Sequence, residues 1–152
     1  MTLISINDRV CTITLNRPED LNPLSWQVLG EIDDTLETYR HDESVGVIVI
    51  EAAGKAFSTG YDLREEHWIT SQYPANFPDR IDLARDRDDV HIIVDYWMKM
   101  WRYPKPIIAK VQGDCLSGAG ELLGVCDLAI VSERARFGHP AGRDLGIPPS
   151  IM

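Results

Sequence analysis

The sequence predicts an α/β fold with a largely parallel sheet. Two apolar, β-branched segments, residues 45–51 and 107–111, lack polar alternation, which is typical of strands buried on both faces. Each is followed by a loop of small residues that opens a predicted helix. Strands that alternate with helices favour parallel pairing, because each helix returns the chain to the same end of the sheet.

The amino-terminal part of the chain predicts a hairpin and a helix. Residues 4–6 and 10–15 are apolar and are separated by a turn at Asn7-Asp8. Ser25 is the predicted N-cap of a helix that runs to about Arg40. One face of this helix carries its apolar side chains, namely Val28, Leu29, Ile32, Leu36 and Tyr39.

The later part of the chain predicts a long helix and a third buried strand. An apolar stripe predicts a helix over roughly residues 81–101, which Pro104 and Pro106 end. Tyr96, Trp97 and Trp101 fall within this helix, where their spacing favours core packing or subunit contact over a ligand pocket. Residues 128–131 are again apolar and predict the third buried strand.

Composition limits the partners and the compartment. The 152-residue chain carries a net charge of −9, which argues against nucleic acid or an anionic membrane surface as a partner. No apolar run approaches the ~20 residues of a membrane span, and the start lacks signal-peptide features. The three cysteines lie in apolar contexts and indicate reduced thiols, hence a cytoplasmic protein. The four histidines lack ligand spacing, so no metal site is expected.

Two strand-to-helix junctions carry the chemistry. Lys105–Leu128, KPIIAKVQGDCLSGAGELLGVCDL, runs from a strand into a small-residue loop and a helix that places Glu121 in its first turn. After residues 45–51, the turn Ser58–Gly60 precedes Tyr61–Leu63, which is predicted to begin a helix. Small residues let backbone N–H groups approach a ligand, and a carboxylate beside such donors suits enolate or acyl chemistry.

The two motifs resemble those of one enzyme family. FSTGYDLRE and KPIIAKVQGDCLSGAGELLGVCDLAIVSERARFGHPAGRDLGIPP together resemble the crotonase (enoyl-CoA hydratase/isomerase) superfamily, and ITLNRPEDLNPLS resembles its opening strand and coenzyme A loop. The resemblance implies a ββα spiral core, with residues 1–152 as one domain that stops before the family's C-terminal helical part. It also implies a homotrimer or dimer of trimers, with no cofactor beyond the coenzyme A of the substrate.

The resemblance also implies the site residues. The oxyanion-hole amides would be those of Tyr61 and Gly118, and Glu121 would be a catalytic acid/base. The alternative is that the glycines only permit turns and that Glu121 only complements the helix dipole. Arg17 or Arg64 would reach a phosphate, or else lie on the surface. By the resemblance, substrate and coenzyme A contacts fall on Asp20, Leu21, Thr59, Gly60, Tyr61, Asp62, Leu63 and Gly118.

The chain departs from the family at one position. In FGHPAGRDLGIPP, Ala141 stands where hydratases carry a second glutamate. One well-placed acid or base contributes ~10²–10⁴ in rate, so hydration should be weak without it. Asp144, one helical turn on, is a candidate replacement; the alternative is a surface aspartate paired with Arg143.

The functional prediction is therefore an enoyl-CoA hydratase/isomerase-type enzyme, most simply a lyase, acting on an acyl-CoA thioester through a stabilised enolate. The missing carboxylate keeps three other crotonase reactions open, which are C–C cleavage, decarboxylation and thioester hydrolysis. A non-catalytic acyl-CoA-binding subunit is the alternative from another functional class.

Overall fold

The computed structural model describes residues 1–64, 83–144 and 149. Its main sheet has five strands in the order β1-β2-β3-β4-β6. The bounds of these strands are β1 Thr2–Asn7, β2 Val10–Leu15, β3 Val47–Ala52, β4 Ile107–Val111 and β6 Leu128–Val131. Strands β1 and β2 are antiparallel and the remaining pairs are parallel, so the predicted α/β class is confirmed.

The predicted amino-terminal hairpin is confirmed, with its turn one residue later than expected. The turn residues are Asp8 and Arg9, with φ of 47° and 66°. Two successive residues in the left-handed region match the right-handed twist of the paired strands.

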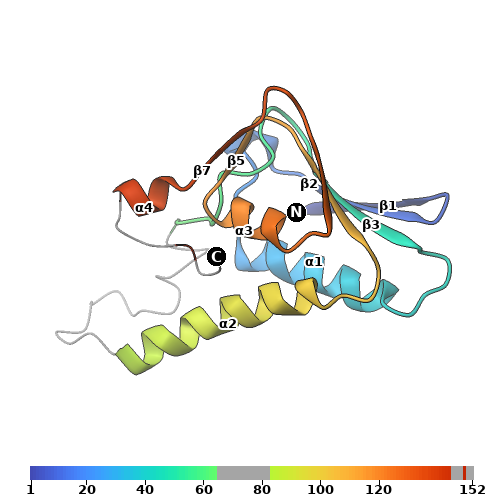
Figure 1. The fold of residues 1–152 in the computed structure, drawn as a ribbon, viewed down its shortest axis with the longest axis horizontal. Coiled ribbons are helices and arrows are strands. Elements are labelled where there is room, and N and C mark those ends of the chain that lie inside the picture. Colours follow the sequence, from blue (N-terminus) through green and yellow to red (C-terminus); the bar gives the residue numbers. More distant parts are fainter. Residues whose placement is uncertain (65–82, 145–148, 150–152) are drawn as a thin grey trace.

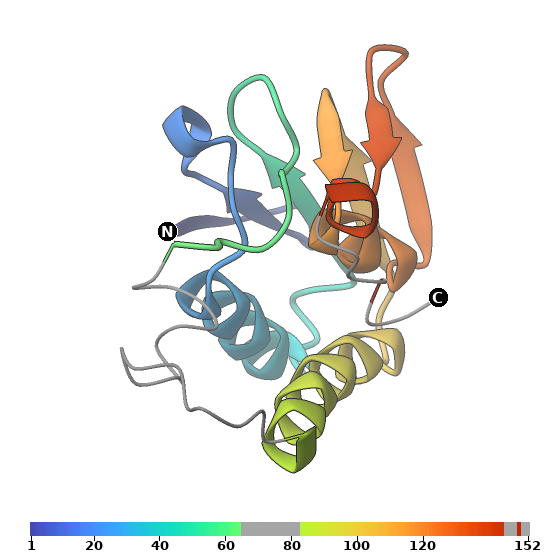
Figure 2. The same ribbon diagram turned by 90° about the vertical axis from the view of Figure 1, so that its left-hand side faces the viewer.

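Helices α1 (Trp26–Tyr39) and α2 (Leu83–Trp101) lie side by side along one side of the sheet (Figures 1 and 2). Helix α1 begins as predicted, because the Ser25 side chain accepts a hydrogen bond from the Val28 N–H. Two buried or half-buried tyrosines tie the helices together: the Tyr96 hydroxyl donates to the Leu29 carbonyl (2.9 Å), and that of Tyr103 donates to Leu36 (2.7 Å).

The core lies between the sheet and these helices. Apolar side chains from the sheet and the helices are buried in this core, and their burial is the main force that holds α1 and α2 against the sheet. Its fully buried members include Ile13, Ile48, Ile50, Ile107 and Ala109 from the strands, Ile32 from α1 and Trp97 from α2.

A second, two-stranded parallel sheet was not predicted. Strands β5 (Asp114–Leu116) and β7 (Arg136–Gly138) form it, and β5 leads into α3 (Gly118–Gly124). The chain then continues from β7 into α4 (Pro140–Asp144). A short 3-10 helix, η1 (Pro18–Asp20), follows β2.

Two predictions about elements are wrong. Residues 128–131 form a strand, but Leu128, Ile130 and Val131 are exposed, because the elements that the structure describes do not cover them. Tyr61–Leu63 do not begin a helix. Tyr61 instead forms a parallel bridge with Leu24, and the Asp62 N–H donates to the Leu24 carbonyl (2.9 Å). Backbone pairing across the chain replaces the local helical pattern.

Candidate active site

The two sequence motifs meet through a parallel backbone bridge. The Ser58 N–H donates to the Asp114 carbonyl and the Leu116 N–H donates to the Ser58 carbonyl, each at 3.0 Å. These bonds join the loop after β3 to strand β5. They therefore set the Gly60-Tyr61 segment beside the start of α3.

Glycine is required at both places where the two backbones touch. A Cβ on Gly60, whose φ is +95°, would lie 2.8 Å from the Leu116 carbonyl oxygen. A Cβ on Gly118 would lie 2.7 Å from the Tyr61 ring. Contacts this short leave no room for a side chain, so the glycines permit close approach as well as turning.

The backbone amides of Tyr61 and Gly118 belong to adjoining segments. Gly118 is the first residue of α3, and the first N–H groups of a helix have no acceptor within it. Ser117, just before it, has a φ of 50°, a conformation that costs ~1–3 kcal/mol in a non-glycine residue and often marks functional sites. This geometry is compatible with the two oxyanion-hole donors that the resemblance implies.

Glu121 lies at the centre of a cluster of three side chains. It is only 6% exposed, and its Oε2 accepts hydrogen bonds from the Tyr61 hydroxyl and from Trp97 Nε1 (3.0 Å). Trp97 Nε1 also lies 3.0 Å from the Tyr61 hydroxyl oxygen, which accepts its hydrogen. A buried carboxylate held by two donors can act as a positioned acid or base, which goes beyond complementing the helix dipole.

The sequence motifs point to the Tyr61 amide and to Glu121, but not to the Tyr61 phenol or the Trp97 indole. Trp97 did carry a signal, because an indole N–H within an apolar stripe needs an acceptor when it is buried. The sequence alone does not indicate which acceptor that is.

Hydrogen bonds hold the loop before α1 against the same site. Asn22 is buried in a left-handed conformation, with φ of 53°. Its side chain accepts from the Arg17 N–H (2.8 Å) and donates to the carbonyls of Ala53 (2.8 Å) and Ala56 (3.0 Å). The Leu24 N–H donates to the Gly60 carbonyl at 2.8 Å, so the loop and Gly60 are held together.

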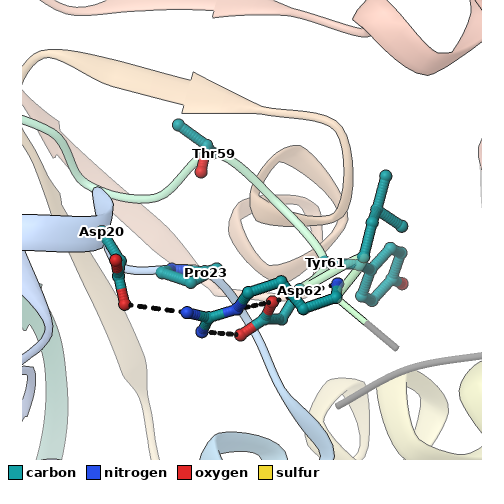
Figure 3. Close-up of a pocket in the computed structure, with 7 residues that line it drawn as sticks. Asp20, Pro23, Thr59, Tyr61 and Asp62 are labelled. Carbon is teal, nitrogen blue, oxygen red and sulfur yellow. Dashed lines mark hydrogen bonds and ion pairs between the residues drawn. The ribbon is translucent and has the colours of Figure 1, made fainter. Parts of the chain in front are cut away.

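An ion-pair network lies beside this loop (Figure 3). The buried Asp62 carboxylate accepts from Arg17 Nη1 at 2.9 Å and from Arg64 Nε at 2.8 Å. Asp20 accepts from Arg17 Nη2 at 2.5 Å and from Arg64 Nη1 at 3.3 Å. Burial opposes the charge on Arg17, but its hydrogen bonds to Asp62 and Asp20 outweigh burial and raise its pKa.

A pocket of about 360 Å³ opens at this network. Five of the eight residues predicted to contact substrate or coenzyme A line it, while Leu21, Gly60 and Gly118 do not. The lining residues are Asp20, Pro23, Thr59, Tyr61, Asp62, Leu63 and Arg64 (Figure 3). Arg17 is buried under its two carboxylates, whereas the Arg64 side chain is 43% exposed and is the better placed of the two to meet a phosphate.

Asp144 lies on the surface of α4. Its carboxylate accepts two hydrogen bonds from Arg143, at 2.6 and 3.0 Å, and the Arg143 bonds lower its pKa. Ala141 lies half-buried in the same helix. Helix α4 follows β7, whose last residue, Gly138, accepts a hydrogen bond from the Ser117 N–H (2.9 Å). This contact ties the start of α4 to the start of α3.

The described residues contain no group of three or more His, Cys, Asp or Glu side chains arranged to hold a metal ion. Burial raises the pKa of the Cys115 and Cys126 thiols to about 12, so both stay protonated at neutral pH. Among the described helices, none is long and apolar enough to cross a membrane.

Comparisons with known proteins point to one family. Residues 5–152 match the family model described as "Enoyl-CoA hydratase/isomerase". A probable mitochondrial enoyl-CoA hydratase of Dictyostelium discoideum is 37% identical over 132 residues, which cover 87% of this chain and 43% of the relative. A hydroxycinnamoyl-CoA hydratase-lyase of Pseudomonas fluorescens is 35% identical over 149 residues, which cover 98% of this chain and 51% of the relative.

Comparison with solved structures points to the same family. The crystal structure of an enoyl-CoA hydratase/isomerase from Xanthobacter autotrophicus Py2 matches with a TM-score of 0.81 at 36% identity, covering 98% of this chain and 52% of that chain. The chain thus spans about half the length of the relatives it matches.

Proposed function

Because this chain belongs to the enoyl-CoA hydratase/isomerase (crotonase) family, we propose that the protein acts on acyl-CoA thioesters through a stabilised enolate. The observation that carries the proposal is the position of Glu121. Its carboxylate is buried in the first turn of α3, held by Tyr61 and Trp97, three residues after the Gly118 amide.

The Tyr61 and Gly118 amides are the proposed oxyanion hole. They would donate to the thioester oxygen, on which negative charge grows as the enolate forms. Removing one such donor typically costs ~10²–10³ in rate. Coenzyme A would lie along the pocket lined by Asp20, Thr59 and Arg64, with a phosphate near the exposed Arg64 guanidinium.

Glu121 is the proposed acid/base. In double-bond isomerisation it would take the α-proton of a 3-enoyl thioester, leaving a dienolate, and return a proton to the γ-carbon. One carboxylate suffices for this sequence of steps. Hydration of a 2-enoyl thioester requires more, because water must lose a proton as its oxygen adds to the β-carbon while another proton reaches the α-carbon.

Ala141 therefore favours isomerisation over hydration as the principal reaction. This position lacks the second carboxylate, and Asp144, the candidate replacement, is exposed and paired with Arg143. Hydration would need Asp144 to leave that ion pair and approach the substrate.

The test uses the purified full-length protein in D₂O with 2-enoyl- and 3-enoyl-CoA esters, including aromatic ones, read by mass spectrometry. We expect double-bond migration with deuterium incorporation, lost in Glu121→Gln. The control is Glu43→Gln, because Glu43 is exposed in the loop after α1. Binding of every ester without any chemistry would contradict the proposal and support a non-catalytic acyl-CoA-binding subunit.

A further inference from the structure

Two side chains from distant parts of the chain converge on one oxygen of Glu121. The Tyr61 hydroxyl, from the loop after β3, and the Trp97 indole N–H, from α2, both donate to Oε2. The indole N–H also donates to the Tyr61 oxygen. Each of the three groups is thus hydrogen-bonded to the other two, and Trp97 is fully buried.

We propose that the Tyr61 phenol and the Trp97 indole are positioning residues for Glu121, holding its carboxylate in the orientation that proton transfer requires. The proposal rests on the acid/base role proposed above for Glu121. It gives Tyr61 two tasks: its amide faces the thioester oxygen, and its phenol holds the base.

The donor chemistry explains why this arrangement fixes one orientation. An indole N–H only donates, so Trp97 cannot exchange roles with its partners. Both bonds end on Oε2, so rotating the carboxylate about its last side-chain torsion breaks both. Bonds to a charged acceptor are about twice as strong as neutral ones, and partial desolvation around a 6% exposed carboxylate strengthens them further.

Gly118 is part of the same arrangement. The Tyr61 ring lies against it so closely that a Cβ there would come within 2.7 Å of the ring. The missing side chain therefore lets the phenol reach over the start of α3 to Glu121. The close contact between Gly118 and the Tyr61 ring therefore places both a proposed oxyanion-hole amide and the phenol that holds Glu121.

The test is Tyr61→Phe in the full-length protein, which removes one oxygen and keeps the backbone amide. Tyr103→Phe is the matched control, because the Tyr103 hydroxyl is also part of a buried hydrogen bond, to the Leu36 carbonyl at 2.7 Å, but does not contact Glu121. Each variant removes a hydroxyl that is hydrogen-bonded in the folded protein, so both melting temperatures should fall; Tyr61→Phe loses the bonds to Glu121 and from Trp97, and its melting temperature should fall at least as far as that of Tyr103→Phe.

For Tyr61→Phe we expect kcat for proton transfer from a 3-enoyl-CoA ester to fall about tenfold or more, since a hydrogen bond to a charged group is lost. KM should stay within twofold, and Tyr103→Phe should keep the wild-type kcat. An unchanged kcat in Tyr61→Phe, or a raised KM with unchanged kcat, overturns the proposal.

Trp97→Phe tests the same positioning role without changing Tyr61. The kcat of this variant should also fall. The double variant should fall by less than the product of the two single effects, because both donors act on one carboxylate. Glu121→Gln separates the two proposals. If it abolishes turnover while Tyr61→Phe and Trp97→Phe do not lower kcat, positioning fails and the proposed function stands; if it retains turnover, the proposed function itself fails.

Discussion

The Tyr61 hydroxyl donates a hydrogen bond to the carboxylate of Glu121, sixty residues further along the chain. This bond links the two motifs of the candidate site by side chains, in addition to the backbone bridge at Ser58. Tyr61 therefore both carries one proposed oxyanion-hole amide and holds the carboxylate of the proposed base. Changes at this junction should affect chemistry more than stability.

Gly118→Ala should damage the site directly. The new Cβ would meet the Tyr61 ring at 2.7 Å, so the ring must move away from Glu121. We expect kcat/KM to fall about 10²-fold or more, in line with loss of an oxyanion-hole donor. Gly124→Ala, in the same helix, is the matched control, because a Cβ there meets nothing within 4 Å.

The control should keep the wild-type kcat/KM and gain up to ~1 kcal/mol in stability, since alanine favours a helix over glycine. Equal activity of the two variants in a steady-state assay would show that the contact between Gly118 and Tyr61 is unimportant.

Asp62→Asn should mainly destabilise the protein. Asp62 is 3% exposed and neutralises Arg17 and Arg64, so its loss leaves buried positive charge less well paired. We expect about 3 kcal/mol lower free energy of unfolding in urea titrations.

Asp88→Asn tests whether burial causes that loss. Asp88 pairs with Arg87, and both side chains are 66% exposed. Its loss should cost less than ~1 kcal/mol, as is typical of surface ion pairs. A similar cost for both variants would mean that the network around Arg17 contributes no more than a surface pair.

Asp144→Asn should leave double-bond migration intact. Its carboxylate is exposed and paired with Arg143. We expect kcat within about twofold of wild type on 3-enoyl-CoA esters, whereas one catalytic acid or base is worth ~10²–10⁴. A loss in that range, above all in water addition to 2-enoyl-CoA, would identify Asp144 as the second acid/base.

Glu31 should make stability depend on pH. Burial opposes its charge, but hydrogen bonds from the amino-terminal ammonium and Thr2 outweigh burial and lower its pKa from 4.5 to about 2. A lowered pKa in the folded state stabilises the protein above the unfolded pKa, and that contribution is lost as pH falls from 4.5 toward 2.

Glu31→Gln should therefore cost about 2 kcal/mol at neutral pH, with a difference from wild type that shrinks as the pH falls below the unfolded pKa. Urea unfolding across this range measures it. If the difference in free energy of unfolding between wild type and variant stays constant with pH, the charge of the Glu31 carboxylate does not contribute to stability.

The sequence predicted the elements whose signals are local. The β-branched run before Glu51 and the N-cap at Ser25 both led to the observed strand and helix. Strands β5 and β7 have three residues each, too few for a periodic pattern, and were missed. The exposure of residues 128–131 was also missed, because apolarity does not tell which elements cover a strand.

Some features of the candidate site could likewise be predicted from local motifs, and others could not. Gly60 and Gly118 could be identified from their motifs, and the structure brings their segments into contact. The hydrogen bonds among Tyr61, Trp97 and Glu121 join three separate elements, so no local pattern encodes them. The expected helix at Tyr61–Leu63 failed for a related reason, since pairing with Leu24 competes with the local helical bonds.

The most direct test of the central claim is a crystal structure of the full-length protein with an unreactive acyl-CoA analogue bound. The analogue must keep the carbonyl oxygen, which we expect about 2.7–3.1 Å from the Tyr61 and Gly118 amide nitrogens. The Glu121 carboxylate should face the α-carbon and stay hydrogen-bonded to Tyr61 and Trp97. An acyl group bound away from these amides, or a Glu121 carboxylate turned from the α-carbon, would contradict the account.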